Sequence, residues 1–261
     1  MVDYPLTRAQ IRFYRENGYV QLTNMLAPEE LSQIREALKS VNRMKLSDAQ
    51  HVSRANPEYE KLFVQKVNLW TVHEGIRQYV FNKKIANVAR RLVGARKIRL
   101  WHDHALIKMP GDSRESPWHQ DLPYWPMNEP GALSCWMALD DVDERNGCMQ
   151  FVPKSHSWGT FPPVDLMQGA DLFEQARAAH PGQDLDMRPV TMAMPAGSCT
   201  FHDGRTFHYA SANRSSKPRR AMVTIYMPQG VTYNGAGHVV TDGQGLKPGR
   251  PIAGDRFPVL A

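Results

Sequence analysis

The most informative part of this sequence is Pro117-Trp118-His119-Gln120-Asp121-Leu122-Pro123-Tyr124-Trp125-Pro126. Its prolines and aromatic residues favour extended backbone over helix. Residues two apart on a strand project from the same face, so we expect His119 and Asp121 to point together. Such a pair is often only a hydrogen-bonded contact at a sheet edge. With a second histidine it becomes the set of two histidines and one carboxylate that is typical of non-haem Fe(II) oxygenases.

A second stretch, residues 197–213, offers two further histidines, His202 and His208. From the residues alone, either of them could complete the set. Asn213 follows His208 by five residues, and Arg219 follows it by eleven. The two histidines therefore differ in their spacing to Asn213 and Arg219. Both lie in a segment that is expected to form strands.

Composition predicts one globular domain. The chain has 261 residues, of which 42% are hydrophobic and 22% charged, and all-β domains reach this length without splitting. The net charge is +6, but lysines and arginines are scattered and form no contiguous basic stretch, so we expect no nucleic-acid partner. An anionic substrate or cosubstrate is enough to explain the positive balance.

Cysteine usage and the N-terminus bear on location. Cys135, Cys148 and Cys199 lie in apolar runs without a Cys-x-x-Cys pair, which indicates buried thiols in a reducing compartment and argues against zinc. The first residues contain no apolar signal-peptide region, and no apolar run approaches membrane-spanning length. We therefore expect a cytoplasmic protein with no membrane partner.

The pattern of elements changes along the chain. Helices are expected at 8–16, from 28 onwards and at 83–92, strands at 19–22 and 63–70, and a loop at 45–60. Short strands with Gly and Pro turns follow, expected at 99–108, 134–139, 148–152, 190–194, 198–202, 207–210 and 220–227, with a partly helical excursion at 164–181. This order predicts a mainly β fold with flanking helices, a sandwich or barrel.

Taken together, Trp118-His119-Gln120-Asp121, His208, Asn213 and Arg219 resemble the phytanoyl-CoA dioxygenase family of Fe(II)- and 2-oxoglutarate-dependent oxygenases. The resemblance covers most of the chain and includes residues 107–111, 139–149, 152–156 and the helices of residues 7–38. It implies a double-stranded β-helix, which is a cupin-like jelly roll. We expect one domain, 1–261, with N-terminal helices at about 7–93, a jelly-roll core at about 99–227 and a C-terminal tail at 228–261.

The resemblance also implies roles for individual residues. His119, Asp121 and His208 become the Fe(II) ligands and the catalytic centre, and the family spacing to Asn213 favours His208 over His202. The guanidinium of Arg219 would bind the distal carboxylate of the cosubstrate 2-oxoglutarate, a pairing that suits its planar fork. The neighbouring Arg220 should point to the other face of its strand. Lys66 and Trp136 also match family positions near the cosubstrate.

The expected reaction uses dioxygen to oxidise, most simply to hydroxylate, a small-molecule substrate, and it releases succinate and CO2. Related halogenases have a small residue in place of the ligating carboxylate, so Asp121 favours hydroxylation over halogenation. Six residues around the expected iron site are candidates for substrate binding: Trp101, Asp103, His104, Tyr124, Trp125 and Arg205.

Alternatives remain for these six residues and for the chain as a whole. The aromatic residues could simply pack, and Asp103 and Arg205 could stabilise the barrel rim through a salt bridge or turn hydrogen bonds. Arg205 and the basic balance hint at an anionic substrate. The main alternative function is a non-catalytic jelly-roll binding module. Substrate contacts are expected from the loops at 40–60 and 164–181 and from the tail after Gly230, but neither the substrate itself nor the oligomeric state follows from the sequence.

Overall fold

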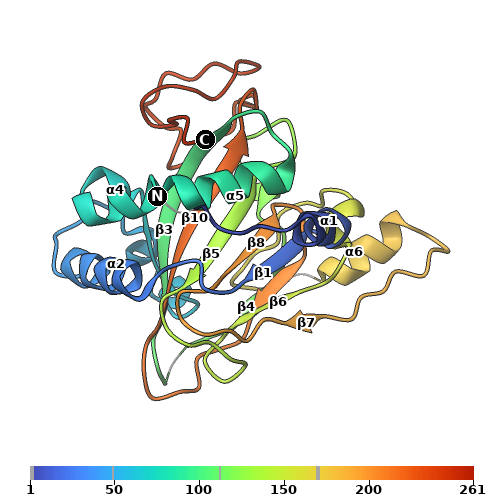
Figure 1. Ribbon diagram of the computed structural model, residues 1–261. Helices are drawn as coiled ribbons and strands as arrows, with labels where there is room; N and C mark the ends of the chain where they lie inside the picture. The colour runs from blue at the N-terminus through green and yellow to red at the C-terminus, as the bar shows by residue number, and fades with distance from the viewer. Residues whose placement is uncertain (1–2, 49, 112, 169–170) are drawn as a thin grey trace.

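The computed structural model describes residues 3–48, 50–111, 113–168 and 171–261, without the side chains of residues 54 and 55. Two antiparallel sheets form its core (Figure 1). The larger sheet has the strand order β1-β8-β5-β10-β3-β2, and the smaller has the order β4-β9-β6-β7. The expected mainly β jelly-roll architecture is confirmed. The strands are β1 (Tyr19–Leu22), β2 (Val64–Val67), β3 (Ile98–Lys108), β4 (Ser116–His119), β5 (Leu133–Ala138), β6 (Met149–Phe151), β7 (Val190–Thr191), β8 (Cys199–Asp203), β9 (His208–Ala210) and β10 (Arg219–Pro228).

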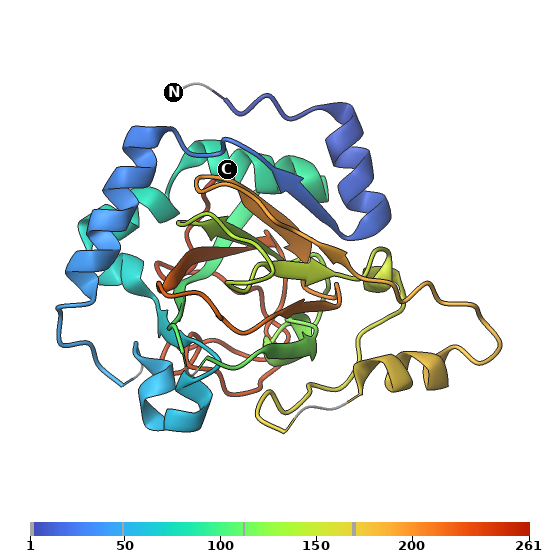
Figure 2. The same cartoon turned by 90° about the horizontal axis from the view of Figure 1, so that it is seen from below.

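Helices cover the outer face of the larger sheet. Seen from below, α1, α2 and α5 lie along one side of the strands, and α6 lies on the other (Figure 2). Apolar residues of α2 and α5, such as Leu38 and Leu92, share one buried cluster with Cys135 and Met222 of the sheet. The α-helices are α1 (Arg8–Asn17), α2 (Pro28–Val41), α3 (Pro57–Glu60), α4 (Glu74–Val80), α5 (Lys83–Val93) and α6 (Leu172–Ala179).

Local signals set the ends of the first helix. Thr7 and Gln10 form a capping box at the start of α1, and Gly18 ends the helix in the left-handed region, at φ 81°. The expected helices at 8–16, 28 onwards and 83–92 are all present. Burial of β5 on both faces follows from this cover, because its outer face meets the helices and its inner face meets the interior between the sheets.

The segment before β3 is more structured than the sequence indicated. The expected loop at 45–60 contains the 3-10 helix η1 (Val52–Ala55) and α3, and α4 was not anticipated. The expected strand at 63–70 ends at Val67, because Asn68 adopts a left-handed backbone at φ 54° and the 3-10 helix η2 (Leu69–Thr71) follows. β1 and β2 also come from this segment, and they form the two edges of the larger sheet.

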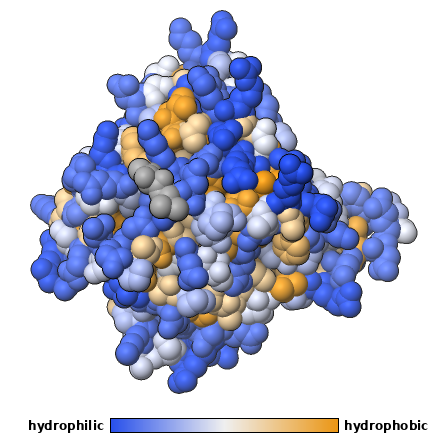
Figure 3. Space-filling view, viewed as in Figure 1, coloured by the Kyte–Doolittle hydropathy of each residue, from blue (hydrophilic) through white to orange (hydrophobic). Residues whose placement is uncertain are grey.

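The C-terminal tail runs across one end of the sheets, at the top of Figure 1. It adds Val240, Ile252 and Phe257 to the core between the sheets, and Val259 pairs with Arg99 of β3. Hydrophilic residues cover most of the face seen in Figure 3, with apolar residues in small patches between them. Within the described part of the chain, every helix is too short or too polar to cross a membrane.

Candidate active site

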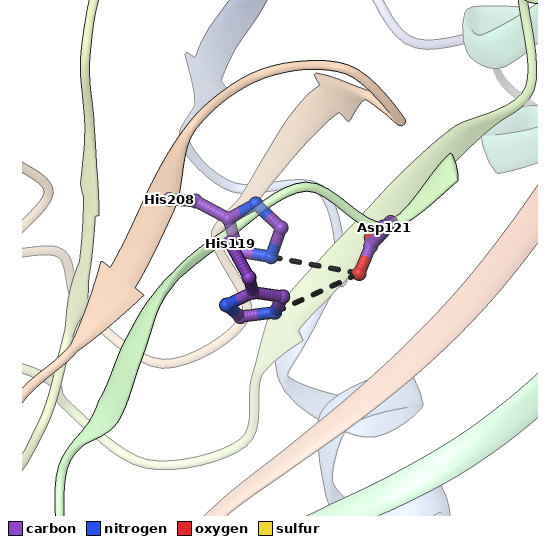
Figure 4. A group of neighbouring side chains, drawn as sticks. All are labelled: His119, Asp121 and His208. Atoms are coloured by element: carbon purple, nitrogen blue, oxygen red, sulfur yellow. Dashed lines mark ion pairs between the residues drawn. The ribbon is translucent and has the colours of Figure 1, made fainter. Parts of the chain in front are cut away.

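His119, Asp121 and His208 meet between the two sheets (Figure 4). His119 ends β4 and is the register partner of His208 at the start of β9, so neighbouring strands bring the two imidazoles together. Their Nε2 atoms lie 3.9 Å and 3.6 Å from Oδ1 of Asp121. One ligand atom from each residue lies within 4.8 Å of the other two. This spacing suits a single metal ion.

The position of Asp121 has a different origin from the one expected. β4 ends at His119, and Asp121 has helical backbone angles, φ −78° and ψ −41°, just before the 3-10 helix η3 (Leu122–Tyr124). Strand alternation therefore does not bring the two side chains together. The turn into η3 does so, and Pro123 within η3 fits the first turn of a helix.

Hydrogen bonds fix which nitrogen of each histidine is available to a metal. Nδ1 of His119 donates to the carbonyl oxygen of Pro117 at 2.7 Å, and Nδ1 of His208 donates to that of Thr206 at 2.9 Å. A carbonyl only accepts, so each Nδ1 carries the proton and each Nε2 has a free lone pair facing Asp121. Burial lowers the pKa of both histidines, which keeps the rings neutral.

The carboxylate of Asp121 stays ionised. Burial alone would raise its pKa, but His208, His202 and His119 around it hold the pKa well below its usual range. Its other oxygen, Oδ2, accepts a hydrogen bond from Ser134 Oγ at 2.8 Å and lies 3.3 Å from His202 Nε2. His202 therefore contacts the oxygen that faces away from the other two histidines. Among the described residues, it is not part of the group that could hold a metal.

Arg219 lies in the same cavity with unused donors. It begins β10, is 2% exposed, and its guanidinium stacks over the ring of Trp136 at 5.2 Å. Among the described residues, its Nε and Nη1 have no hydrogen-bond partner. Burial lowers its pKa to about 10, so the group remains a cation at neutral pH. A buried cation with free donors fits a carboxylate ligand. Arg220 points to the other face, as expected, and pairs with Asp140.

A cavity of about 330 Å³ connects these groups. Side chains from both sheets line it, including the three ligand candidates and Arg219. Five further residues singled out in the sequence also line it, namely His104, Tyr124, Trp125, Trp136 and His202. The donor set and the neighbouring cation thus suit Fe(II) with a chelating dicarboxylate beside it.

Two of the expected substrate-binding residues on β3 face elsewhere. The register of β3 against β10 shifts at Trp101, whose indole is buried and stacks on Phe257 of the tail at 5.4 Å instead of lining the cavity. Asp103 is fully buried on the opposite face, where its carboxylate accepts hydrogen bonds from the backbone N–H groups of Leu69 and Trp70. Asp103 thus holds the chain where it enters η2.

Arg205 and Lys66, which were expected near the substrate and the cosubstrate, also lie outside the cavity. Arg205 lies in the turn after β8 and pairs with Asp203, Nε to Oδ1 at 3.1 Å, so it does not reach the cavity. On β2, Gln65 and Val67 face the cavity, whereas Lys66 is buried on the other face, where its ammonium donates to Asn42 after α2. Strand alternation explains the misplacement of Lys66, because one residue changes the face.

Some lining residues were not anticipated. His102 lies two residues from His104 on the same face of β3, which alternation alone could have indicated. Ser134 lies on β5 two residues before Trp136, so the same signal was present. Tyr59 and His238 come from two of the segments that were expected to supply substrate contacts, residues 40–60 and the tail after Gly230, although neither residue was named.

Comparisons with known proteins agree with this geometry. The sequence model of the phytanoyl-CoA dioxygenase (PhyH) family matches residues 14–221. The peroxisomal phytanoyl-CoA dioxygenase of Bos taurus is 27% identical over 234 residues, which cover 83% of this chain and 67% of that protein. The ectoine dioxygenase of Bordetella parapertussis is 28% identical over 246 residues, covering 88% of this chain and 78% of that protein.

Solved structures give the same result over almost the whole chain. The non-haem alpha-ketoglutarate-dependent carbocyclase SnoK from nogalamycin biosynthesis matches with a TM-score of 0.79 and 29% identity, covering 98% of this chain and 97% of that one. The epimerase SnoN, in complex with Fe3+, alpha-ketoglutarate and nogalamycin RO, matches with a TM-score of 0.76 and 29% identity, covering 97% and 98%. The matched regions therefore extend well beyond the residues of the site.

Proposed function

Because this chain belongs to the phytanoyl-CoA dioxygenase family and is a non-haem Fe(II)- and 2-oxoglutarate-dependent dioxygenase, we propose that His119, Asp121 and His208 hold its iron and that Arg219 binds its cosubstrate. One observation carries this proposal. Three ligand atoms within 4.8 Å of one another share a cavity with a buried guanidinium whose Nε and Nη1 have no partner among the described residues.

The residues have distinct tasks in this proposal. The two Nε2 atoms and Oδ1 of Asp121 would hold the metal through three ligands, a set that leaves room for further ligands. Arg219 pairs with the distal carboxylate of 2-oxoglutarate, and Trp136 stacks against the guanidinium and fixes its plane. Bound iron supplies the oxidising chemistry, and the balanced reaction joins substrate, dioxygen and 2-oxoglutarate to give hydroxylated substrate, succinate and CO2.

The substrate is a small molecule that enters the same cavity. We propose hydroxylation as the outcome, because Asp121 supplies the carboxylate ligand and leaves no ligand position for a halide. We also propose that residues 1–261 act as one domain, which β1 and β2 support by joining the N-terminal segment to the larger sheet. A reducing compartment such as the cytoplasm suits Cys135, Cys148 and Cys199, which are free and buried.

Succinate formation tests the proposal. Purified protein is loaded anaerobically with Fe(II) and 2-oxoglutarate, and the charge-transfer absorption of the complex is recorded before oxygen is admitted. Succinate should form slowly even without a prime substrate, and only when both Fe(II) and oxygen are present. The Asp121→Ala variant is the matched control and should give neither the absorption band nor succinate. A protein that binds 2-oxoglutarate but never forms succinate would instead be a binding module.

A further inference from the structure

The cavity has two chemically different ends. Along β10, Arg219 stands at one end, Val223 pairs with His104 and Trp136, and Ile225 pairs with His102. His102 therefore lies one cavity-facing position, or two residues, beyond the level of Val223, at the end away from Arg219. His238 of the tail reaches the same end, where its ring centroid lies 6.1 Å from that of His102.

The charged side chains of the cavity are those already assigned to the iron and to 2-oxoglutarate. Among the described residues that line the cavity, Asp121 and Arg219 are the only ones with a charged side chain. The remaining wall is apolar, aromatic or neutral and polar, and it includes Tyr59, Phe63, Trp125, Leu166 and Val239. An ionic substrate would lose its hydration here without gaining a counter-charge, which is strongly unfavourable.

The two histidines at this end offer complementary hydrogen bonds. Nδ1 of His102 donates to the carbonyl oxygen of Asp103 at 3.2 Å, so its Nε2 is an acceptor. Nδ1 of His238 accepts from the backbone N–H of Val240 at 3.2 Å, so its Nε2 carries a proton and is a donor. Burial lowers the pKa of both rings, which keeps them uncharged at neutral pH.

We propose that this end of the cavity binds an uncharged, largely apolar compound and orients it through hydrogen bonds between its hydroxyl or carbonyl groups and the imidazoles of His102 and His238. The inference rests on the proposed function for the positions of the iron and the cosubstrate. It replaces the hint of an anionic substrate, which depended on Arg205 and on the basic charge balance. That guanidinium pairs with Asp203 outside the cavity, and the buried cation that does line it, Arg219, is assigned to 2-oxoglutarate.

A matched pair of probes tests the charge preference. The anaerobic Fe(II)–2-oxoglutarate complex is titrated at pH 7 with 2-naphthol, which is neutral, and with 2-naphthoate, which has the same rings and a negative charge. We expect 2-naphthol to bind at least about tenfold more tightly, since the carboxylate would be buried without a partner. Equal affinities, tighter binding of 2-naphthoate, or no binding of either probe at millimolar concentration would overturn the proposal.

Variants test the role of the two imidazoles. His102→Phe and His238→Phe keep a ring of similar shape but remove the hydrogen bonds, so the double variant should weaken 2-naphthol binding about tenfold or more. Unchanged affinity in the double variant would overturn the assigned contacts. Gln65→Arg, which adds a cation to the wall, should shift the preference towards 2-naphthoate. The charge-transfer absorption of the complex is followed in every variant, so a failure of iron or cosubstrate binding is distinguished from a failure of probe recognition.

Discussion

Ser134 Oγ donates a hydrogen bond of 2.8 Å to Oδ2 of Asp121, while Oδ1 of the same carboxylate faces the Nε2 atoms of His119 and His208. His202 Nε2 lies 3.3 Å from the same Oδ2. The two carboxylate oxygens therefore have separate partners. With Oδ2 held by β5 and β8, Asp121 can offer a metal one oxygen, and the remaining positions stay open for a chelating cosubstrate.

Ser134→Ala should weaken Fe(II) binding by about 10- to 100-fold, because the ligating carboxylate loses the donor that orients it. Ser198→Ala is a matched control, since Ser198 is also buried and its Oγ has no hydrogen-bond partner among the described residues. Isothermal titration of the anaerobic protein with Fe(II) measures both affinities. If Ser134→Ala binds Fe(II) as tightly as Ser198→Ala does, the hydrogen bond does not orient the ligand.

His119→Ala, Asp121→Ala and His208→Ala should each abolish turnover and reduce Fe(II) binding below detection, because two ligands remain in each variant. His202→Ala should keep a weakened site, since it removes only a contact to Oδ2. Fe(II) titration and succinate formation are measured on all four variants. An active His208→Ala protein beside an inactive His202→Ala protein would reverse the assignment of the distal ligand.

Arg219→Ala should raise the KM for 2-oxoglutarate while leaving Fe(II) affinity nearly unchanged. Loss of one partner of a buried, hydrogen-bonded charge pair costs about 2–5 kcal/mol, which corresponds to a rise of roughly 30-fold or more. Arg219→Lys should recover part of this, because an ammonium lacks the planar fork. The control is Arg220→Ala, which breaks the pair with Asp140 on the other face and should not change this KM. An unaltered KM in Arg219→Ala would contradict the cosubstrate assignment.

Gln120→Ala should reduce both stability and Fe(II) affinity. Gln120 lies between His119 and Asp121 in the sequence. Its side chain donates from Nε2 to the carbonyl oxygens of Gly159 and Arg205, while Oε1 accepts from the N–H of Phe161. Each buried group left without a partner costs about 1–3 kcal/mol. Gln78→Ala, an exposed glutamine on α4, is the control for chemical denaturation and Fe(II) titration. Wild-type values in Gln120→Ala would show that the backbone holds the ligands unaided.

Much of this site could be predicted because its residues match a family motif that extends over most of the chain. The resemblance to the phytanoyl-CoA dioxygenase family pointed to His119, Asp121, His208 and Arg219, and the structure brings all four to one cavity. Even so, the strand argument for Asp121 was wrong in its cause, since the turn into η3 positions the carboxylate. A sequence motif can therefore predict which side chains come together without revealing the backbone conformation that brings them there.

The residues that were misassigned or missed depend on strand register and long-range packing. One displaced residue changes the face of a strand, so Lys66 was assigned to the cavity although Gln65 and Val67 face it. Trp101 sits at the register shift between β3 and β10, which its own sequence does not reveal. The contribution of His238 depends on how the tail returns across the sheets. Long-range packing of this kind leaves no local pattern in a single sequence.

Asp103 provides the last prediction, which concerns stability and pH. Its carboxylate is fully buried and accepts hydrogen bonds of 3.1 Å and 3.2 Å from the N–H groups of Leu69 and Trp70. Burial raises its pKa from 3.8 to about 7, although these two amide donors oppose the rise. Between about pH 4 and pH 7 the folded state therefore binds more protons at this position than the unfolded state does, and the free energy of unfolding falls as the pH rises.

The Asp103→Asn variant cannot titrate at this position, so its free energy of unfolding should lack this decrease with pH. Urea unfolding of both proteins across this range should show the stability of the wild type falling relative to the variant, with turnover per folded molecule equal in the two at pH 7. A constant difference in stability would mean that the carboxyl group has the same pKa in the folded and unfolded states, and a lower turnover in the variant would return Asp103 to the substrate site.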